Sequence, residues 1–280
     1  MTEGFINKII PFSAVDGPGN RMTIFLQGCN FNCIYCHNPE TIKKCKHCGE
    51  CVSLCPEGAL KKENGTVQWD KESCVECGVC TGNCGNSSSP KVMQLTAEQI
   101  VDGIRPYKHF IDGITVSGGE CTLQKGFLGE LFELAVQEGL SCMIDSNGSC
   151  DFEEQEELLK WCEGVMLDVK VYDEKTHLKY IGTTNKMVLK NLEFLAKSGK
   201  LYEVRTVIVP ELFDNEQTVR EVAKILKQSE TIIRYKLIAF RPVGVKHHEA
   251  LMMTPTQTYM ESLRELALEE GAREVILVGH

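Results

Sequence analysis

The chain has 280 residues, 42% of them hydrophobic, which suits one large domain with a smaller one attached. Its net charge of -9 gives no general basic field, so neither nucleic acid nor an anionic membrane is an expected partner. The first ten residues lack a signal-peptide core, and no segment approaches the roughly 20 apolar residues that span a bilayer, so a cytoplasmic protein is expected.

Short apolar runs alternate with amphipathic stretches along most of the chain. The runs predict strands at residues 22–26, 113–116, 142–145, 165–169, 204–209, 235–240 and 274–278. The stretches predict helices that begin near Thr96, Gly126, Phe152, Asn185, Asp214 and Thr256. Thr96 with Gln99, and Asp151 with Glu154, have the spacing of a capping box. The alternation predicts an α/β fold of six parallel units in a partial or complete barrel or an open sheet, with the site at the carboxyl ends of the strands.

The first predicted strand is followed by three closely spaced cysteines, Cys29, Cys33 and Cys36. A 4Fe–4S cluster normally takes four thiolates, so three cysteines leave one iron without a protein ligand. A structural zinc site is the alternative, and His37 could serve as its fourth ligand on sequence grounds. Closed zinc sites take paired ligands, however, so the three-cysteine pattern favours an open cluster.

Residues 43–90 differ from the rest of the chain and contain an internal repeat. The chain has 15 cysteines, and the repeat Cys-x2-Cys-x2-Cys-x3-Cys accounts for eight of them. This is the two-cluster pattern of bacterial ferredoxins, in which the fourth cysteine of each run binds the other cluster. The predicted ligand sets are Cys45, Cys48, Cys51 and Cys84 for one cluster, and Cys74, Cys77, Cys80 and Cys55 for the second. We therefore expect an inserted ferredoxin-like domain at 43–90, with a polar linker at 86–90, between two parts of a main domain at 1–42 and 91–280.

Three later strands each end in a polar motif. The motifs are Ser117-Gly118-Gly119-Glu120, Asp145-Ser146-Asn147-Gly148 and Asp168-Val169-Lys170. Paired glycines let the backbone approach a ligand closely, and a carboxylate can accept hydrogen bonds from an ammonium group. Each motif alone is more simply a turn, a cap or a surface ion pair, but their order along the chain favours one shared site.

Together these motifs resemble the radical S-adenosylmethionine (SAM) superfamily. The spacing of Cys29, Cys33, Tyr35 and Cys36 matches its signature, and residues 16–21 and 37–39 resemble the activating enzymes of glycyl-radical enzymes. Within that family the two-cluster insert is similar to the YjjW-type activases. The resemblance implies a partial (β/α)6 TIM-like barrel, three 4Fe–4S clusters and SAM as cofactor. It also implies a glycyl-radical enzyme as protein substrate, activated by a 5′-deoxyadenosyl radical, and a low-potential flavodoxin or ferredoxin as reductant.

The resemblance also implies roles for individual residues. Cys29, Cys33 and Cys36 would hold the catalytic cluster. The implied SAM-binding residues are Tyr35, His37, Gly118, Gly119, Glu120, Asp145, Ser146, Asp168, Lys170 and Arg205. Asp145 and Asp168 would also be placed to share a monovalent cation near SAM. The chain departs from the family at two positions. Cys121 stands where the family commonly has proline, and Arg241 stands near the position where pyruvate formate-lyase activases have a histidine. Neither residue is given a role.

Two other functions fit parts of the sequence. A radical SAM enzyme that acts on a small molecule or on another protein side chain would share the cluster and SAM motifs, although the flanks at 16–21 and 36–39 favour the activase. An electron-transfer polyferredoxin would explain the repeat, but an open cluster is a reactive liability in a simple carrier. His247 and His248 are expected to be loop residues. The remaining cysteines, Cys121, Cys142, Cys150 and Cys162, are expected to be small buried hydrophobes.

Overall fold

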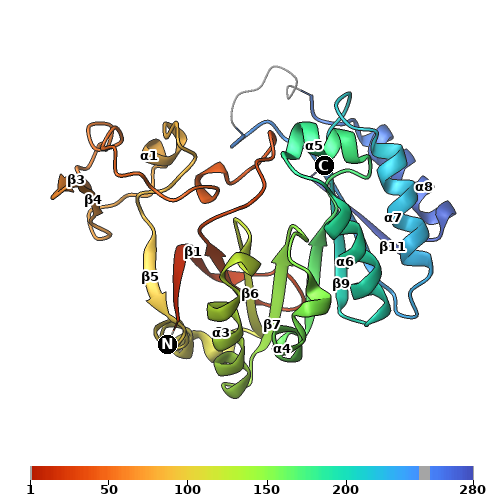
Figure 1. Cartoon of the computed structure of the whole chain (residues 1–280), viewed down its shortest axis with the longest axis horizontal. Coiled ribbons are helices and arrows are strands. Elements are labelled where there is room, and N and C mark those ends of the chain that lie inside the picture. Colours follow the sequence, from red (N-terminus) through yellow and green to blue (C-terminus); the bar gives the residue numbers. More distant parts are fainter. Residues whose placement is uncertain (1, 246–252, 280) are drawn as a thin grey trace.

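The computed structural model describes residues 2–245 and 253–279, so His247 and His248 lie outside the described residues. Its main body is a curved nine-stranded sheet with helices along its outer side (Figure 1). The strand order is β11-β10-β9-β8-β7-β6-β2-β1-β5. The parallel strands are β2 (Arg21–Leu26), β6 (Gly113–Gly118), β7 (Ser141–Ser146), β8 (Gly164–Asp168), β9 (Leu201–Ile208), β10 (Arg234–Ala239) and β11 (Glu274–Val278).

The seven parallel strands are the seven predicted ones, with ends that differ by at most three residues. They confirm the α/β architecture, and they form an open sheet with edges at β11 and β5. The sheet continues beyond β2 through two strands that were not predicted, β1 (Glu3–Ser13) and β5 (Met93–Thr96). Strand β1 runs antiparallel to both of its neighbours.

The helices begin close to the predicted positions. They are α2 (Ala97–Ile104), α3 (Lys125–Gln137), α4 (Glu156–Trp161), α5 (Glu174–Ile181, not predicted), α6 (Lys186–Lys197), α7 (Asn215–Lys227) and α8 (Gln257–Glu270). The predicted capping box of Thr96 and Gln99 is formed at α2. The predicted capping box of Asp151 and Glu154 is wrong. The chain makes a 3-10 turn, η4 (Phe152–Glu154), before α4 begins, so the Asp151 carboxylate accepts from the Glu153 amide instead. In the described part of the chain no helix is long and apolar enough to cross a bilayer.

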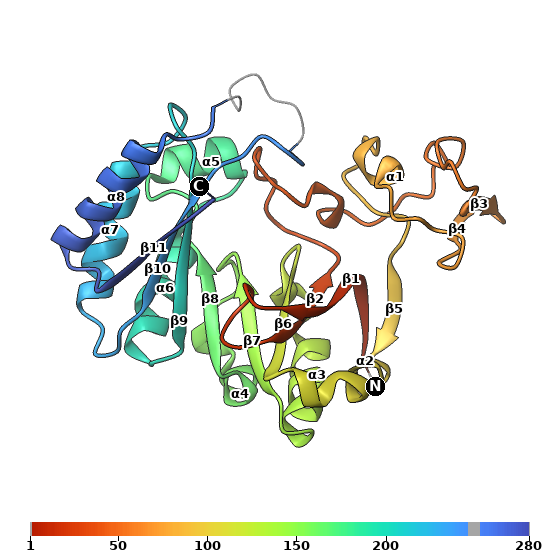
Figure 2. The same cartoon turned by 180° about the vertical axis from the view of Figure 1, so that it is seen from behind.

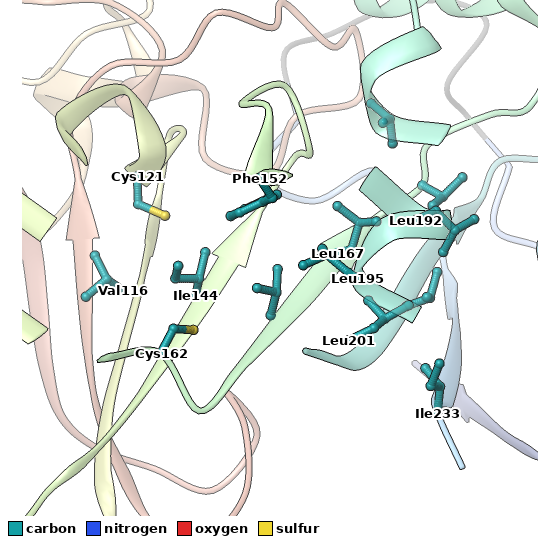
Figure 3. Close-up of a cluster of buried hydrophobic side chains, with 14 of the residues drawn as sticks. Val116, Cys121, Ile144, Phe152, Cys162, Leu167, Leu192, Leu195, Leu201 and Ile233 are labelled. Atoms are coloured by element: carbon teal, nitrogen blue, oxygen red, sulfur yellow. The ribbon is translucent and has the colours of Figure 1, made fainter. Parts of the chain in front are cut away.

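The core fills the space between the sheet and its outer helices. Figure 3 shows part of it, where Ile144 and Val116 lie near the thiols of Cys121 and Cys162, and Leu167 lies next to Leu195. Both cysteines are buried, as is Cys142, which confirms the prediction for these three. Cys150 is only half-buried, so the prediction was wrong there.

The cysteine-rich segment stands to one side of the sheet (Figure 2). It contains a hairpin of β3 (Leu60–Glu63) and β4 (Thr66–Trp69), the short helix α1 (Val79–Gly82) and a small separate core. Its entry and exit segments pair, because the Lys43 amide donates to the Ser87 carbonyl at 2.9 Å. Ser87, Ser88 and Ser89 are buried, so the predicted linker packs against the entry segment.

Candidate functional site

The cysteine triad lies in the loop after β2, which is anchored on two sides. The amides of Gly28 and Cys29 donate to the carbonyls of Thr41 and Ile42. On the other side, the amides of Asn32 and Ile34 donate to carbonyls at the end of α5. These backbone bonds fix the loop over the carboxyl ends of the strands, where the site was predicted.

The three thiols are partly buried and interact electrostatically with one another. Burial raises the pKa of Cys29 to about 11 and that of Cys33 to about 12, and it also raises the pKa of Cys36. The Lys170 ammonium opposes this rise at all three thiols. The thiolate forms therefore need a positive partner, which the irons of a cluster would provide.

The surroundings of the triad fit a cluster with a further ligand. The Tyr35 hydroxyl is buried without a hydrogen-bond partner among the described residues, and the ring lies within electrostatic range of Lys170 and Cys33. A buried hydroxyl of this kind is costly unless a ligand satisfies it. Within residues 2–245 and 253–279, no group of three or more His, Cys, Asp or Glu side chains is placed to hold a single metal ion.

Gly118, Gly119 and Glu120 join the ends of β2, β6 and β7. A Cβ at Gly118 would lie 2.2 Å from the Leu26 nitrogen, and one at Gly119 would lie 2.2 Å from the Gly28 oxygen, so the backbones approach too closely for side chains. The Glu120 carboxylate is buried. It accepts from the amide and hydroxyl of Thr122, the hydroxyl of Ser146 and the amide of Asn147. Glu120 thus holds the β7 loop, and contact between its carboxylate and SAM stays a prediction.

Asn147 is a site residue that the sequence singled out only as part of its motif. Its side-chain amide lies 3.7 Å from the Cys29 sulfur and 3.2 Å from the Asn30 side-chain oxygen. With its backbone amide bound to Glu120 at 2.6 Å, Asn147 connects the β7 loop to the cysteine loop.

Asp145 and Asp168 each have a cationic partner. Asp145 Oδ2 accepts from the Ser117 hydroxyl at 2.8 Å and from Arg205 at 3.0 Å. Asp168 Oδ2 lies 2.6 Å from Lys170 Nζ. Burial acts to lower the pKa of Arg205, but Asp145, Glu203 and Asp168 raise it, so the guanidinium stays charged. The predicted monovalent cation stays a prediction, because both carboxylates are already paired.

Glu203 and Lys236 extend this charge network, and the sequence did not single them out. Glu203 is fully buried on β9, one pleat from Arg205, and its Oε1 accepts from Arg205 Nε at 2.6 Å. The Lys236 ammonium on β10 lies 2.9 Å from Glu203 Oε2. The sequence did contain one signal for this pair. Glu203 lies two residues before Arg205 in a mostly apolar strand, so both side chains lie on the same face of the sheet.

The flank at 16–21 lies at the opposite, amino end of the strands. Arg21 is fully buried, and its guanidinium donates to Thr115, to Ser141 and to the carbonyls of Pro18 and Ile114. This part of the flank ties the turn before β2 to β6 and β7. At the carboxyl end, His37 Nε2 lies 2.9 Å from the Arg241 carbonyl, so the triad loop also contacts the end of β10.

The eight cysteines of the insert line two neighbouring cavities. One, of about 280 Å³, is lined by Cys45, Cys48, Cys51, Cys80 and Cys84. The second is lined by Cys55, Cys74, Cys77 and Cys80. The fourth cysteine of each run therefore lies with the other run, as in the predicted ligand sets, while cluster binding itself stays a prediction.

The architecture is that of a known class. The model of the radical SAM superfamily matches residues 23–226. Among solved structures, Escherichia coli QueE aligns with a TM-score of 0.53 at 13% identity, over 99% of this chain and 95% of that one, which supports the fold alone.

Curated relatives narrow the class. A Haemophilus influenzae protein, whose name assigns it provisionally to the glycyl-radical enzyme activating enzymes, is 30% identical over 96% of this chain and 92% of its own. The pyruvate formate-lyase-activating enzyme of Streptococcus mutans is 28% identical, with coverages of 86% and 79%. The trans-4-hydroxy-L-proline dehydratase activating enzyme of Clostridioides difficile is 26% identical, with coverages of 90% and 91%. The chain belongs to the radical SAM superfamily and, within it, to the activating enzymes of glycyl-radical enzymes.

Proposed function

We propose that this protein activates a partner glycyl-radical enzyme by removing one hydrogen from a glycine Cα. The reduced cluster, when bound, supplies the electron that splits SAM into methionine and a 5′-deoxyadenosyl radical, which takes that hydrogen. The observation that carries the proposal is the convergence of the three thiols with Glu120, Asp168 and Lys170 at the carboxyl ends of β2, β6 and β8.

The chain's own residues bind and orient the reactants. Cys29, Cys33 and Cys36 would hold three irons in a loop fixed by backbone bonds, leaving the fourth iron open. Lys170 is largely shielded from solvent, interacts electrostatically with Cys33 and is held at Asp168, so its ammonium suits the SAM carboxylate. The glycines before Glu120 let the β6 backbone approach the ligand closely.

We assign the remaining predicted SAM contacts to the same pocket. Tyr35 and His37 belong to the triad loop, and Ser146 and Asp145 close β7. Arg205 is held toward Asp145 from β9. A monovalent cation between Asp145 and Asp168 would share these carboxylates with Arg205 and Lys170, which contact their Oδ2 atoms.

We also propose that residues 43–90 form a ferredoxin-like domain with two further clusters, as in the YjjW-type activases. Its support is the grouping of the eight cysteines around two cavities. Cys48 and Cys77, one in each run, are exposed, so each cluster would reach the surface. Such clusters would pass electrons from a low-potential flavodoxin or ferredoxin to the SAM cluster. The resulting oxygen sensitivity suits an anaerobic cytoplasm.

Product analysis tests the proposed function. The protein is reconstituted anaerobically, reduced and given SAM, and 5′-deoxyadenosine is measured with and without a glycyl-radical protein. We expect formation that depends on the partner and is lost in Cys33→Ala, with Cys121→Ala as a buried-cysteine control that retains it. Sustained SAM turnover driven by a small molecule in the absence of any such protein would favour the small-molecule alternative.

A further inference from the structure

The insert contains a buried donor that its own residues do not satisfy. Trp69 lies at the end of β4, and its indole nitrogen is buried without a hydrogen-bond partner in the part of the chain that the structure describes. A buried donor left unpaired costs about 1–3 kcal/mol, so an acceptor is expected at this position.

The indole ring is held next to the second cysteine cavity. It lines that cavity together with Cys55, Cys74, Cys77 and Cys80. Trp69 is paired with Leu60 across the hairpin and packs against the small core of the insert. The next amide, that of Asp70, donates to the Ala59 carbonyl at 2.9 Å, which fixes the end of the strand.

Among the side chains around this cavity, the acceptors are mainly sulfur atoms. Glu57 also lines it, but this residue is exposed, whereas the indole nitrogen is shielded from water. The ring also borders a larger cleft between the insert and β1, whose side chains include the donors Lys71 and Lys91 and the carboxylates of Glu40 and Glu76. The buried indole nitrogen is hydrogen-bonded to neither carboxylate. A cluster bound by the four cysteines would bring sulfur acceptors to the side of the ring that faces the second cavity.

We propose that the Trp69 indole N–H donates a hydrogen bond to a sulfur of the cluster held by Cys55, Cys74, Cys77 and Cys80, and thereby raises the reduction potential of that cluster. The inference rests on the proposed function, because it requires the second insert cluster. One-electron reduction adds a negative charge to the cluster, so a donor directed at its sulfur stabilises the reduced state more than the oxidised one. Trp69 would make this cluster the easier of the two to reduce, other contacts being equal.

The two tryptophans of the chain provide a matched pair of variants. Trp69→Phe keeps an aromatic ring and removes the N–H. Trp161→Phe makes the same change on α4, outside the insert, where the ring lies under Lys160. Both full-length proteins are reconstituted, and their clusters are titrated with reductant under electron paramagnetic resonance.

We expect one insert cluster of Trp69→Phe to become harder to reduce, by up to about tenfold in its equilibrium constant, or about 59 mV for a one-electron couple. Trp161→Phe should titrate like the wild type. In Trp161→Phe, Trp69 is the remaining tryptophan, and its fluorescence should be quenched when the clusters are built. An unchanged potential at full iron loading, or unquenched Trp69 fluorescence, would overturn this inference but leave the proposed insert clusters standing. A wild-type content of about four irons per chain, instead of about twelve, would overturn the insert clusters and the inference with them.

Discussion

Replacement of Lys236 by methionine should destabilise the folded protein by about 3 kcal/mol. Glu203 is fully buried, and the Lys236 ammonium is the nearest charge to its Oε2, at 2.9 Å. The geometry does not make a hydrogen bond, so the attraction is electrostatic. The next cation at this oxygen is Arg234, at 3.9 Å. Lys236→Met therefore leaves Glu203 Oε2 with only this more distant cation, while Oε1 keeps its pair with Arg205 Nε.

The magnitude follows from the distance and the burial. Two unit charges 2.9 Å apart attract by about 6 kcal/mol at an effective dielectric constant of about 20. Part of this attraction is offset, because methionine, unlike lysine, has no charge whose hydration is lost on folding. Breaking a buried pair therefore costs about 3–5 kcal/mol. The lower end applies because the Lys236 side chain is 16% exposed and Arg205 still pairs with Glu203. At about 2–4 °C per kcal/mol, the unfolding midpoint should fall by about 6–12 °C.

Thermal unfolding of the reconstituted protein, followed by circular dichroism, measures this loss. The double variant Glu203→Gln/Lys236→Met replaces the buried charge with a neutral amide that can still accept from Arg205 Nε, and it should recover part of the loss. Lys224→Met is the surface control, because its ion pair with Glu221 is 46% and 29% exposed and should contribute less than about 1 kcal/mol. A midpoint of Lys236→Met within about 2 °C of wild type, or no recovery in the double variant, would refute the reasoning.

Three further predictions concern a helix cap, a buried histidine and the cysteine repeat. Thr96→Ala removes the capping box of α2 and should cost about 1 kcal/mol in thermal unfolding, and an unchanged midpoint would contradict this. Burial lowers the pKa of His177, so below about pH 6.5 the unfolded state takes up a proton that the folded state does not. Stability should therefore fall as pH drops from 7 toward 5.5, by up to about 1.4 kcal/mol per pH unit from this group, and an equal slope in His177→Gln would argue against it. Cys74→Ala should remove one cluster, about four of twelve irons, while chemically reduced protein still cleaves SAM; loss of all the iron would exclude separate sites.

The strands that carry the site could be predicted because strands of a parallel sheet are buried on both faces and read as continuous apolar runs. Strand β1 could not be predicted in this way. Of its eleven residues only Gly4 and Ile6 are buried, and it contains Pro11, which is unusual within a strand. The hairpin of β3 and β4 did have a signal, the Asn64-Gly65 turn, where both residues have positive φ.

The motifs indicated which strand ends meet, but they could not indicate how the charges there are satisfied. Glu120 is an example, because its four hydrogen bonds come from Thr122, Ser146 and Asn147, and its partners on β7 depend on how β6 and β7 lie in the sheet. Glu203 is a second example. Its partner Lys236 belongs to another strand, and only the register between β9 and β10 brings the two side chains together.

The activase function is tested most directly by the radical itself. The reconstituted, reduced protein is mixed anaerobically with SAM and a glycyl-radical protein whose glycines carry deuterium at Cα, and a protonated sample runs in parallel. We predict a stable glycyl signal by electron paramagnetic resonance, a doublet in the protonated sample, and deuterium in the 5′-deoxyadenosine from the labelled one. Cys33→Ala should give neither. A fully loaded protein that neither binds nor cleaves SAM, or 5′-deoxyadenosine that carries no deuterium while a glycyl radical forms, would contradict direct hydrogen abstraction by this enzyme.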